Sequence, residues 1–195
     1  VFLMLSHLRP RRSVLYMPGA NARALEKART LPADAFILDL EDAVSPESKV
    51  QAREQVCQAV TAGGYGPREV IIRVNGLNTE WAEADLRAAG ALAADGILLP
   101  KIEEPQQIAE AVRILDEVDM QKQLPIWIMA ETPRGLLNIE AIAGGHPRLK
   151  VIVMGTSDLA KDMRVRHTAD RVGLLVPLSL AVMAARAHGI EIVDG

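Results

Sequence analysis

Residues 35–42 read Ala35-Phe36-Ile37-Leu38-Asp39-Leu40-Glu41-Asp42, an apolar run that ends in acid residues. A short run with almost no charge is typical of a strand buried on both faces, as in a parallel sheet. The same pattern returns along the chain in short runs rich in Val, Ile and Leu: Val14–Pro18, Val70–Val74, Gly96–Pro100, Ile126–Ala130, Val151–Gly155 and Ile190–Val193. The stretch therefore predicts one strand of a repeated unit.

Between these runs lie segments with apolar residues at three- and four-residue spacing, which is typical of helices. They are Asn21–Thr30, Ser48–Ala62, Thr79–Ala93, Pro105–Val118 and Pro177–His188. Regular alternation of strand and helix predicts an α/β fold with a parallel sheet, and its order favours a (β/α)₈ TIM barrel. The alternative is an open doubly wound sheet, but the turn after the first strand, at residues 18–23, lacks the GxGxxG signature of that fold.

The number of strands sets a limit on this barrel. A (β/α)₈ barrel typically needs about 250 residues, whereas this chain has 195 and about seven strand-like runs. We therefore expect residues 1–195 to form a single, incomplete TIM-barrel catalytic domain that stops after strand seven. The eighth strand and a lid segment are expected to be absent, through truncation, or to be supplied from elsewhere.

Composition excludes several classes of function. A net charge of -3 gives no electrostatic basis for binding nucleic acid, and 3% aromatic residues argue against base stacking. The single cysteine, Cys57, excludes an internal disulfide and fits a reducing, cytoplasmic location. The apolar segment Val1–Leu8 is far shorter than the roughly 18 residues of a membrane span, and it lacks the features of a signal peptide.

Polar side chains gather where the apolar runs end. In a parallel barrel these ends lie on one rim, which is the face where barrel active sites form. Carboxylates, an arginine and a lysine are therefore expected at one mouth: Asp39, Glu41, Asp42, Arg73, Lys101, Glu131, Asp158 and Asp194.

Glu131 and Asp158 follow neighbouring strands, so their carboxylates are expected to meet above the sheet. Hard carboxylate oxygens with open water positions suit Mg²⁺. No histidine, the usual Zn²⁺ ligand, stands at the end of a run. The sequence therefore predicts a Mg²⁺ site at these two acids. The alternative is that each acid caps the helix that follows, a position that Asp favours.

Arg73 lies inside an apolar run, where an unpaired charge would be very costly. Its guanidinium could clamp a substrate carboxylate or stabilise an enolate oxygen. The alternative is a structural ion pair with Glu41 or Asp42, and one arginine can serve both roles.

Two lysines also need an interpretation. Lys101 could form a Schiff base, but the adjacent Glu103 and Glu104 are expected to keep its pKa high, which favours an electrostatic or structural role. Lys27, in the first predicted helix, either meets a phosphate at the rim or belongs to a solvated helix face.

Several motifs together resemble one known family, the citrate lyase β-subunit-like or HpcH/HpaI aldolase superfamily. They occur in the family's order: Arg12-Ser13-Val14-Leu15-Tyr16-Met17-Pro18-Gly19, Leu38-Asp39-Leu40-Glu41-Asp42-Ala43-Val44, Arg73-Val74-Asn75-Gly76-Leu77, Leu99-Pro100-Lys101, Ala130-Glu131-Thr132 and Gly155-Thr156-Ser157-Asp158-Leu159. The ending, from Ala184 to Gly195, is most similar to the CoA-ester lyases of this group.

The resemblance implies a Mg²⁺-dependent carbon–carbon lyase that acts on a 3-hydroxyacyl-CoA such as malyl-CoA or citramalyl-CoA, or on a citryl thioester. It implies a 2-oxo acid as the second reactant or product. By position it implies Glu131 and Asp158 as metal ligands, Glu131 also facing substrate, Arg73 as a catalytic and substrate-binding group, Glu41 and Asp42 as catalytic acids that hold metal-bound water and Arg73, and Tyr16 and Lys27 as contacts of substrate or CoA.

The resemblance also has departures and alternatives. Asn21 stands where relatives carry Arg, and relatives continue past Asp194-Gly195 into an eighth strand and a helical segment. A homo-oligomer, trimer or hexamer, is implied. The alternatives are a CoA-independent class II 4-hydroxy-2-oxo acid aldolase, whose members commonly carry a His at the mouth, a citrate lyase subunit acting on a carrier protein, and a non-catalytic barrel assembly module.

Overall fold

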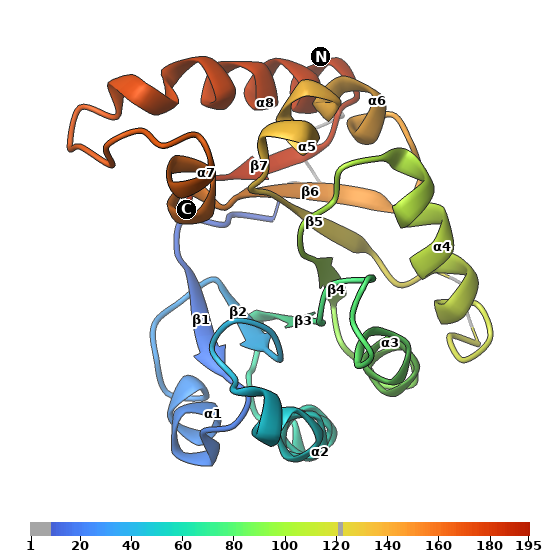
Figure 1. The fold of residues 1–195 in the computed structure, drawn as a ribbon. Coiled ribbons are helices and arrows are strands. Elements are labelled where there is room, and N and C mark those ends of the chain that lie inside the picture. Colours follow the sequence, from blue (N-terminus) through green and yellow to red (C-terminus); the bar gives the residue numbers. More distant parts are fainter. Residues whose placement is uncertain (1–8, 121–122) are drawn as a thin grey trace, which may run out of the picture.

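The chain folds as alternating strands and helices, as the computed structural model shows for residues 9–120 and 123–195 (Figure 1). All strand pairs are parallel, and each strand pairs with the next one along the chain. The strands are β1 (Val14–Pro18), β2 (Ala35–Asp39), β3 (Glu69–Arg73), β4 (Gly96–Leu99), β5 (Ile126–Ala130), β6 (Leu149–Met154) and β7 (Glu191–Val193). The prediction of seven parallel strands is confirmed, whereas the expectations for residues 1–8 lie outside the described residues.

The sheet curls around an interior, with helices on its outer face (Figure 1). In the described part of the chain β1 pairs only with β2 and β7 only with β6, so the sheet is open between β7 and β1. The fold is therefore a curled, α/β half-barrel with the strand order expected of a TIM barrel.

The helices agree with the five predicted segments; four of them are shorter than predicted, whereas the fifth begins two residues earlier and ends one residue earlier. They are α1 (Ala22–Ala28), α2 (Lys49–Ala62), preceded by the 3₁₀ turn η2 (Pro46–Ser48), α3 (Ala82–Gly90), α4 (Pro105–Leu115) and α8 (Leu175–Ala187). Four further turns of helix were missed: α5 (Pro133–Leu137), α6 (Ile139–Ala143), α7 (Thr156–Asp162) and η3 (Val172–Leu174). These segments are too short to show a helical period in the sequence.

Helix boundaries follow local signals. Asn21 caps α1 by accepting a hydrogen bond from the Ala24 N–H at 3.1 Å, which stabilises the first turn. At α4, Pro105 is the first helical residue, and the side chains of Glu104 and Gln107 form a reciprocal capping box. None of the helices in the described residues is long and apolar enough to cross a membrane.

Two apolar cores lie on opposite faces of the sheet. The larger core packs the outer face of the strands against the helices. The smaller core fills the interior of the curl: Ile37, Ile71, Leu98, Trp127, Met129, Val151 and Val153. Because alternate residues of a strand point to opposite faces, the same short runs supply both cores. This accounts for their nearly unbroken apolar character.

Candidate active site

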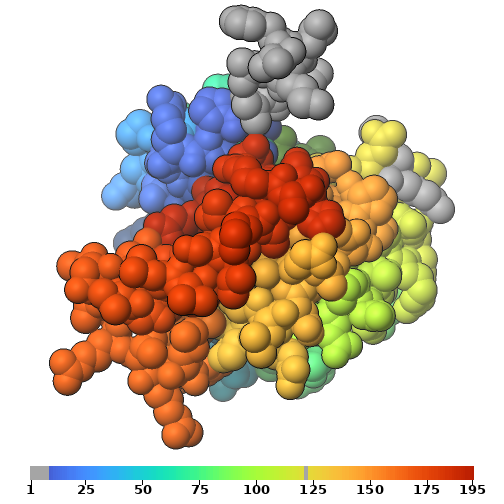
Figure 2. Space-filling view, turned by 90° about the horizontal axis from the view of Figure 1, so that it is seen from above, coloured from blue at the N-terminus to red at the C-terminus, as the bar shows by residue number. Residues whose placement is uncertain are grey.

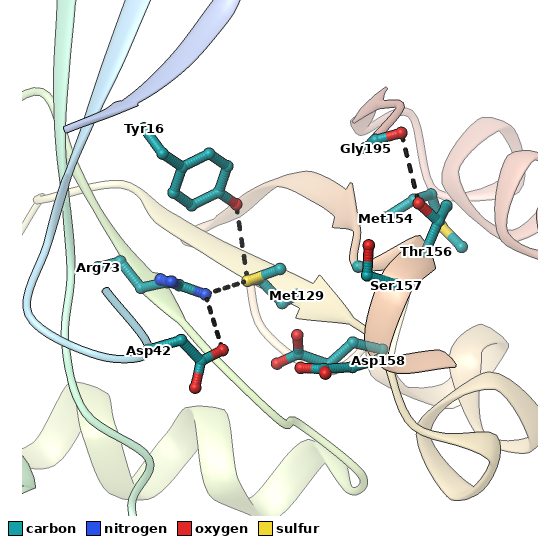
Figure 3. A pocket seen from close by; sticks show the side chains of 11 residues that line it. Tyr16, Asp42, Arg73, Met129, Met154, Thr156, Ser157, Asp158 and Gly195 are labelled. Carbon is teal, nitrogen blue, oxygen red and sulfur yellow. Dashed lines mark hydrogen bonds and ion pairs between the residues drawn. The ribbon is translucent and has the colours of Figure 1, made fainter. Parts of the chain in front are cut away.

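A pocket of about 290 Å³ lies where the strands end. Figure 3 shows side chains from several elements facing it, and no single strand or helix builds it alone. It is lined by Tyr16, Asp42, Arg73, Met129, Glu131, Met154, Gly155, Thr156, Ser157, Asp158 and Gly195. The structure therefore brings Tyr16, Asp42, Arg73, Glu131 and Asp158, five of the residues singled out in the sequence, to one cavity.

Arg73, the last residue of β3, is held by Asp39, the last residue of β2. Its Nε and Nη2 donate to the two Asp39 carboxylate oxygens, each at 2.6 Å, and the two residues are partners in the strand register. Asp39 is fully buried and Arg73 is 6% exposed. Burial disfavours the guanidinium charge, but the hydrogen bonds and charge of Asp39 keep the pKa of Arg73 above its usual value. This bidentate pair fixes the guanidinium plane.

The remaining nitrogen of Arg73 faces the acids that were expected to pair with it. Nη1 lies 3.0 Å from Glu41 Oε2 and 3.6 Å from Asp42 Oδ2, and it donates to Met129 Sδ at 3.4 Å. The expected pairing with Glu41 and Asp42 is confirmed, but Asp39 is the principal partner. The sequence contained a signal for Asp39 as this partner. Neighbouring parallel strands of similar length that end at the same edge place their last side chains next to each other.

Lys101 contacts three of the acids. Its φ of 53° is in the left-handed region, and its N–H donates to Glu131 Oε1 at 2.8 Å. Its Nζ pairs with Glu41 and lies 3.6 Å from Asp42 Oδ1. Burial lowers the pKa of Lys101, but the hydrogen bond to Glu41 and the charges of Glu41, Asp42 and Glu131 together outweigh burial, so the pKa is raised overall. The electrostatic role of Lys101 is supported. The carboxylates that face its ammonium group, Glu41 and Asp42, belong to the loop after β2.

Glu131 follows β5 and is only 1% exposed. Burial raises its pKa to about 7, against the hydrogen bond from the Lys101 N–H, which lowers it. A carboxylate that is costly to ionise in a cavity is one that a cation would stabilise.

Asp158 lies at the same pocket, half-buried in the first turn of α7. Figure 3 shows its carboxylate turned toward the cavity rather than toward its own helix. The capping alternative is wrong for both acids: Thr132 caps α5 through its hydroxyl, which accepts from the Gly135 N–H at 3.0 Å, and Gly155 occupies the N-cap position of α7.

The donor set at this end of the pocket fits Mg²⁺. Glu131 and Asp158 are hard oxygen donors, and Mg²⁺ is usually bound by one or two carboxylates with water and substrate completing its shell. The described residues contain no group of three or more His, Cys, Asp or Glu side chains that could hold a metal by themselves. Substrate or water would therefore have to supply the other positions.

The last two predicted contacts differ in their placement. Tyr16 lines the pocket, its ring lies 4.9 Å from the Arg73 guanidinium carbon, and its hydroxyl donates to Met129 Sδ at 3.6 Å. Burial raises the pKa of Tyr16 to about 12, so the phenol stays protonated. Lys27 is exposed on α1 and is not part of the pocket lining, so a CoA contact for it stays a prediction.

The chain is similar to known proteins along almost its full length. Residues 12–195 match the family described as HpcH/HpaI aldolase/citrate lyase. The (3S)-malyl-CoA thioesterase of Cereibacter sphaeroides (strain KD131) is 47% identical over 186 residues, covering 95% of this chain and 63% of that protein. The citrate lyase subunit beta of Escherichia coli (strain K12) is 32% identical over 191 residues, with the same coverage.

Solved structures share the fold. Protein CitE from Mycobacterium tuberculosis, in complex with magnesium, acetoacetate and coenzyme A, has a TM-score of 0.75 at 26% identity. The match covers 93% of this chain and 64% of that one. The chain spans 63% of the length of the two curated relatives named above. Matching over almost its full described length, the chain belongs to the HpcH/HpaI aldolase/citrate lyase family.

Proposed function

We propose that the protein is a Mg²⁺-dependent carbon–carbon lyase of a 3-hydroxyacyl-CoA thioester such as malyl-CoA or citramalyl-CoA. The observation that carries the proposal is the placement of Arg73 beside a cavity that also holds Glu131 and Asp158. The guanidinium of Arg73 and the carboxylates of Glu131 and Asp158 line a space of about 290 Å³. A space of this size suits a small oxo acid rather than a large acyl group.

The roles of the side chains follow from their contacts. Glu131 and Asp158 would hold Mg²⁺, which supplies a Lewis acid for the oxygens of the 2-oxo acid. Arg73 would stabilise the enolate oxygen of the acetyl thioester as the carbon–carbon bond breaks, because Asp39 aims its guanidinium before substrate arrives. Glu41 and Asp42 would keep water and Arg73 in place.

Tyr16, which covers one face of Arg73, is proposed to contact substrate, and Lys27 to contact CoA. We further propose that the protein acts in the cytoplasm as a homo-oligomer.

A thioesterase is the second candidate, and the 47% identity to (3S)-malyl-CoA thioesterase favours it. The same site could orient water toward the thioester carbonyl instead of breaking the carbon–carbon bond. The two activities differ in their products: a lyase converts malyl-CoA into acetyl-CoA and glyoxylate, whereas a thioesterase converts malyl-CoA and water into malate and free CoA.

The test follows both products from one reaction. Purified protein is given malyl-CoA with and without Mg²⁺, glyoxylate is trapped as its hydrazone, and free thiol is measured with a disulfide reagent. We expect Mg²⁺-dependent glyoxylate without thiol, and a loss of at least 100-fold in Glu131→Ala and Asp158→Ala. Thiol without glyoxylate would establish the thioesterase instead. Unchanged Mg²⁺-dependent turnover in both variants would disprove the metal site.

A parallel assay addresses the remaining alternatives. A free 4-hydroxy-2-oxo acid replaces malyl-CoA, and a citryl carrier protein replaces it in a third reaction. Turnover of the free acid alone would identify a CoA-independent aldolase. A protein that binds no Mg²⁺ in calorimetry and turns over none of these substrates would be an assembly module.

A further inference from the structure

Lys49, the first residue of α2, is a buried lysine behind the pocket. It is 6% exposed and does not line the cavity. Its Nζ donates to the carbonyl oxygens of Leu40 at 2.9 Å and Glu41 at 2.7 Å. The ring of Trp81 lies 5.5 Å from the same nitrogen. The ammonium group is thus surrounded by two main-chain oxygens and an aromatic face.

This arrangement is energetically unusual. Within residues 9–120 and 123–195, no ion pair joins Lys49 to a carboxylate. Burial lowers the pKa of Lys49, although the charges of Asp39 and Glu41 oppose that effect. Because a buried ammonium without an ion-pair partner destabilises the fold, a Lys at this position calls for a function that an apolar side chain could not serve.

The two carbonyls belong to the loop that follows β2 and carries Glu41 and Asp42. The same loop is held from the other side by the Asp39 carboxylate, which accepts from the Glu41 N–H at 2.8 Å and the Ala43 N–H at 3.0 Å. Asp39 therefore binds main-chain N–H groups of this loop, and Lys49 binds its main-chain carbonyl groups. Glu41 is the residue that is held through both its N–H and its carbonyl.

We infer that Lys49 is a positioning residue that sets the main chain of Glu41 and thereby aims its carboxylate between Arg73 and Lys101. The inference deepens the proposed function and rests on it for the effect on turnover. Its structural part stands on the contacts alone. Without the ammonium group, the Leu40 carbonyl loses its side-chain donor and the Glu41 carbonyl keeps only the Val44 N–H, at 3.0 Å. The peptide units can then rotate, and the Glu41 carboxylate leaves Arg73 Nη1, from which it now lies 3.0 Å.

The first test needs no activity. Amide hydrogen exchange is followed in wild type, Lys49→Met and Lys49→Arg, because Met matches the length of Lys without its donors and Arg restores donors and charge. We expect the Glu41 and Ala43 amides to exchange at least tenfold faster in Lys49→Met and to return within about threefold of wild type in Lys49→Arg. Lys49→Gln, which keeps an uncharged amide as a donor group, replaces Lys49→Met if the latter does not fold.

The control for general loosening of the helix is Val56→Ala, since Val56 lies on α2 and is 1% exposed. This change should speed amide exchange along α2, without a particular increase at the Glu41 and Ala43 amides. If Lys49→Met and Val56→Ala give the same pattern, or if exchange in Lys49→Met is unchanged, the positioning role is wrong.

The second test is kinetic. With an active wild type, we expect Lys49→Met to lower kcat at least tenfold with KM changed less than threefold, because Lys49 does not touch the cavity, and Lys49→Arg to recover most of kcat. A wild type without turnover would count against the proposed lyase but not against the exchange result. Faster exchange of Glu41 with unchanged kcat would overturn the inferred effect on turnover.

Discussion

At the scale of the residue, the site depends on charges that would be unfavourable one at a time. Asp39 is fully buried and Arg73 nearly so, yet their bidentate contact satisfies both groups. A buried pair of this kind costs desolvation and is weak evidence for stability. Its value is geometric, since a guanidinium locked by two hydrogen bonds presents its third nitrogen in one direction.

Glu131 gives a prediction for the metal-free protein. The folded pKa is about 7, above the usual value of 4.5, so the native state holds a proton that the unfolded chain releases. Stability should therefore fall as pH rises from about 4.5 to about 7 and stay low above it. The free energy of unfolding should decline by on the order of 3 kcal/mol across that pH range, and Glu131→Gln should remove this decline. Urea unfolding at a series of pH values measures it.

The matched control is Glu110→Gln, an exposed change on α4 that should leave the pH profile unaltered. Saturating Mg²⁺ should also flatten the decline in the wild type, because the ion would favour ionised Glu131. A wild-type profile parallel to that of Glu131→Gln would contradict the raised pKa.

At the scale of the element, the junctions between strands and helices place the functional groups. β6 passes into α7 through Gly155, where a Cβ would lie 2.4 Å from Glu131 Cβ and 2.7 Å from Glu131 Oε2. Neighbouring strands can bring Glu131 and Asp158 to one pocket because this junction has no side chain of its own.

Gly155→Ala should therefore displace the Glu131 carboxylate while leaving the strands and helices formed. We expect Mg²⁺ affinity, measured by calorimetry, to fall at least tenfold with an unchanged far-UV circular dichroism spectrum. Lys161→Ala, an exposed change on the same short helix, should leave the affinity as it is. Wild-type affinity in Gly155→Ala would show that Glu131 is not a ligand or has room to move.

At the scale of the whole molecule, the curl of the sheet joins the site to the inner core. Met129 belongs to that core and touches both Arg73 and Tyr16. Trp127, one inward position earlier on β5, is 1% exposed, and the guanidinium carbon of Arg11 lies 5.0 Å from its ring centre. The floor of the pocket and the centre of the core are therefore continuous.

Trp127→Ala should lower the free energy of unfolding by about 3–5 kcal/mol, because it removes the largest side chain of the inner core and leaves a cavity. Urea unfolding followed by far-UV circular dichroism measures the change. Leu137→Ala, at a side chain 76% exposed on α5, should cost less than about 0.5 kcal/mol. Equal losses in the two variants would mean that the inner core does not stabilise the curl.

The sequence by itself determined the strands, the longer helices and the rim on which the polar residues lie. Apolar runs, helical spacing and signals such as Asn21 and Pro105 act over a few residues, so they can be seen in one dimension. The placement of Glu131 and Asp158 followed from the rule that parallel strands end at one edge, and both line the pocket as expected.

Only the tertiary structure decided which side chains contact each other. Register across β2 and β3 made Asp39 the main partner of Arg73, and curling of the sheet brought Lys101 to Glu41 and not to its sequence neighbours. The position of Lys27 outside the pocket was likewise decided in three dimensions. These contacts depend on strand register and curvature, which arise from the packing of the whole sheet and leave no local pattern in the chain.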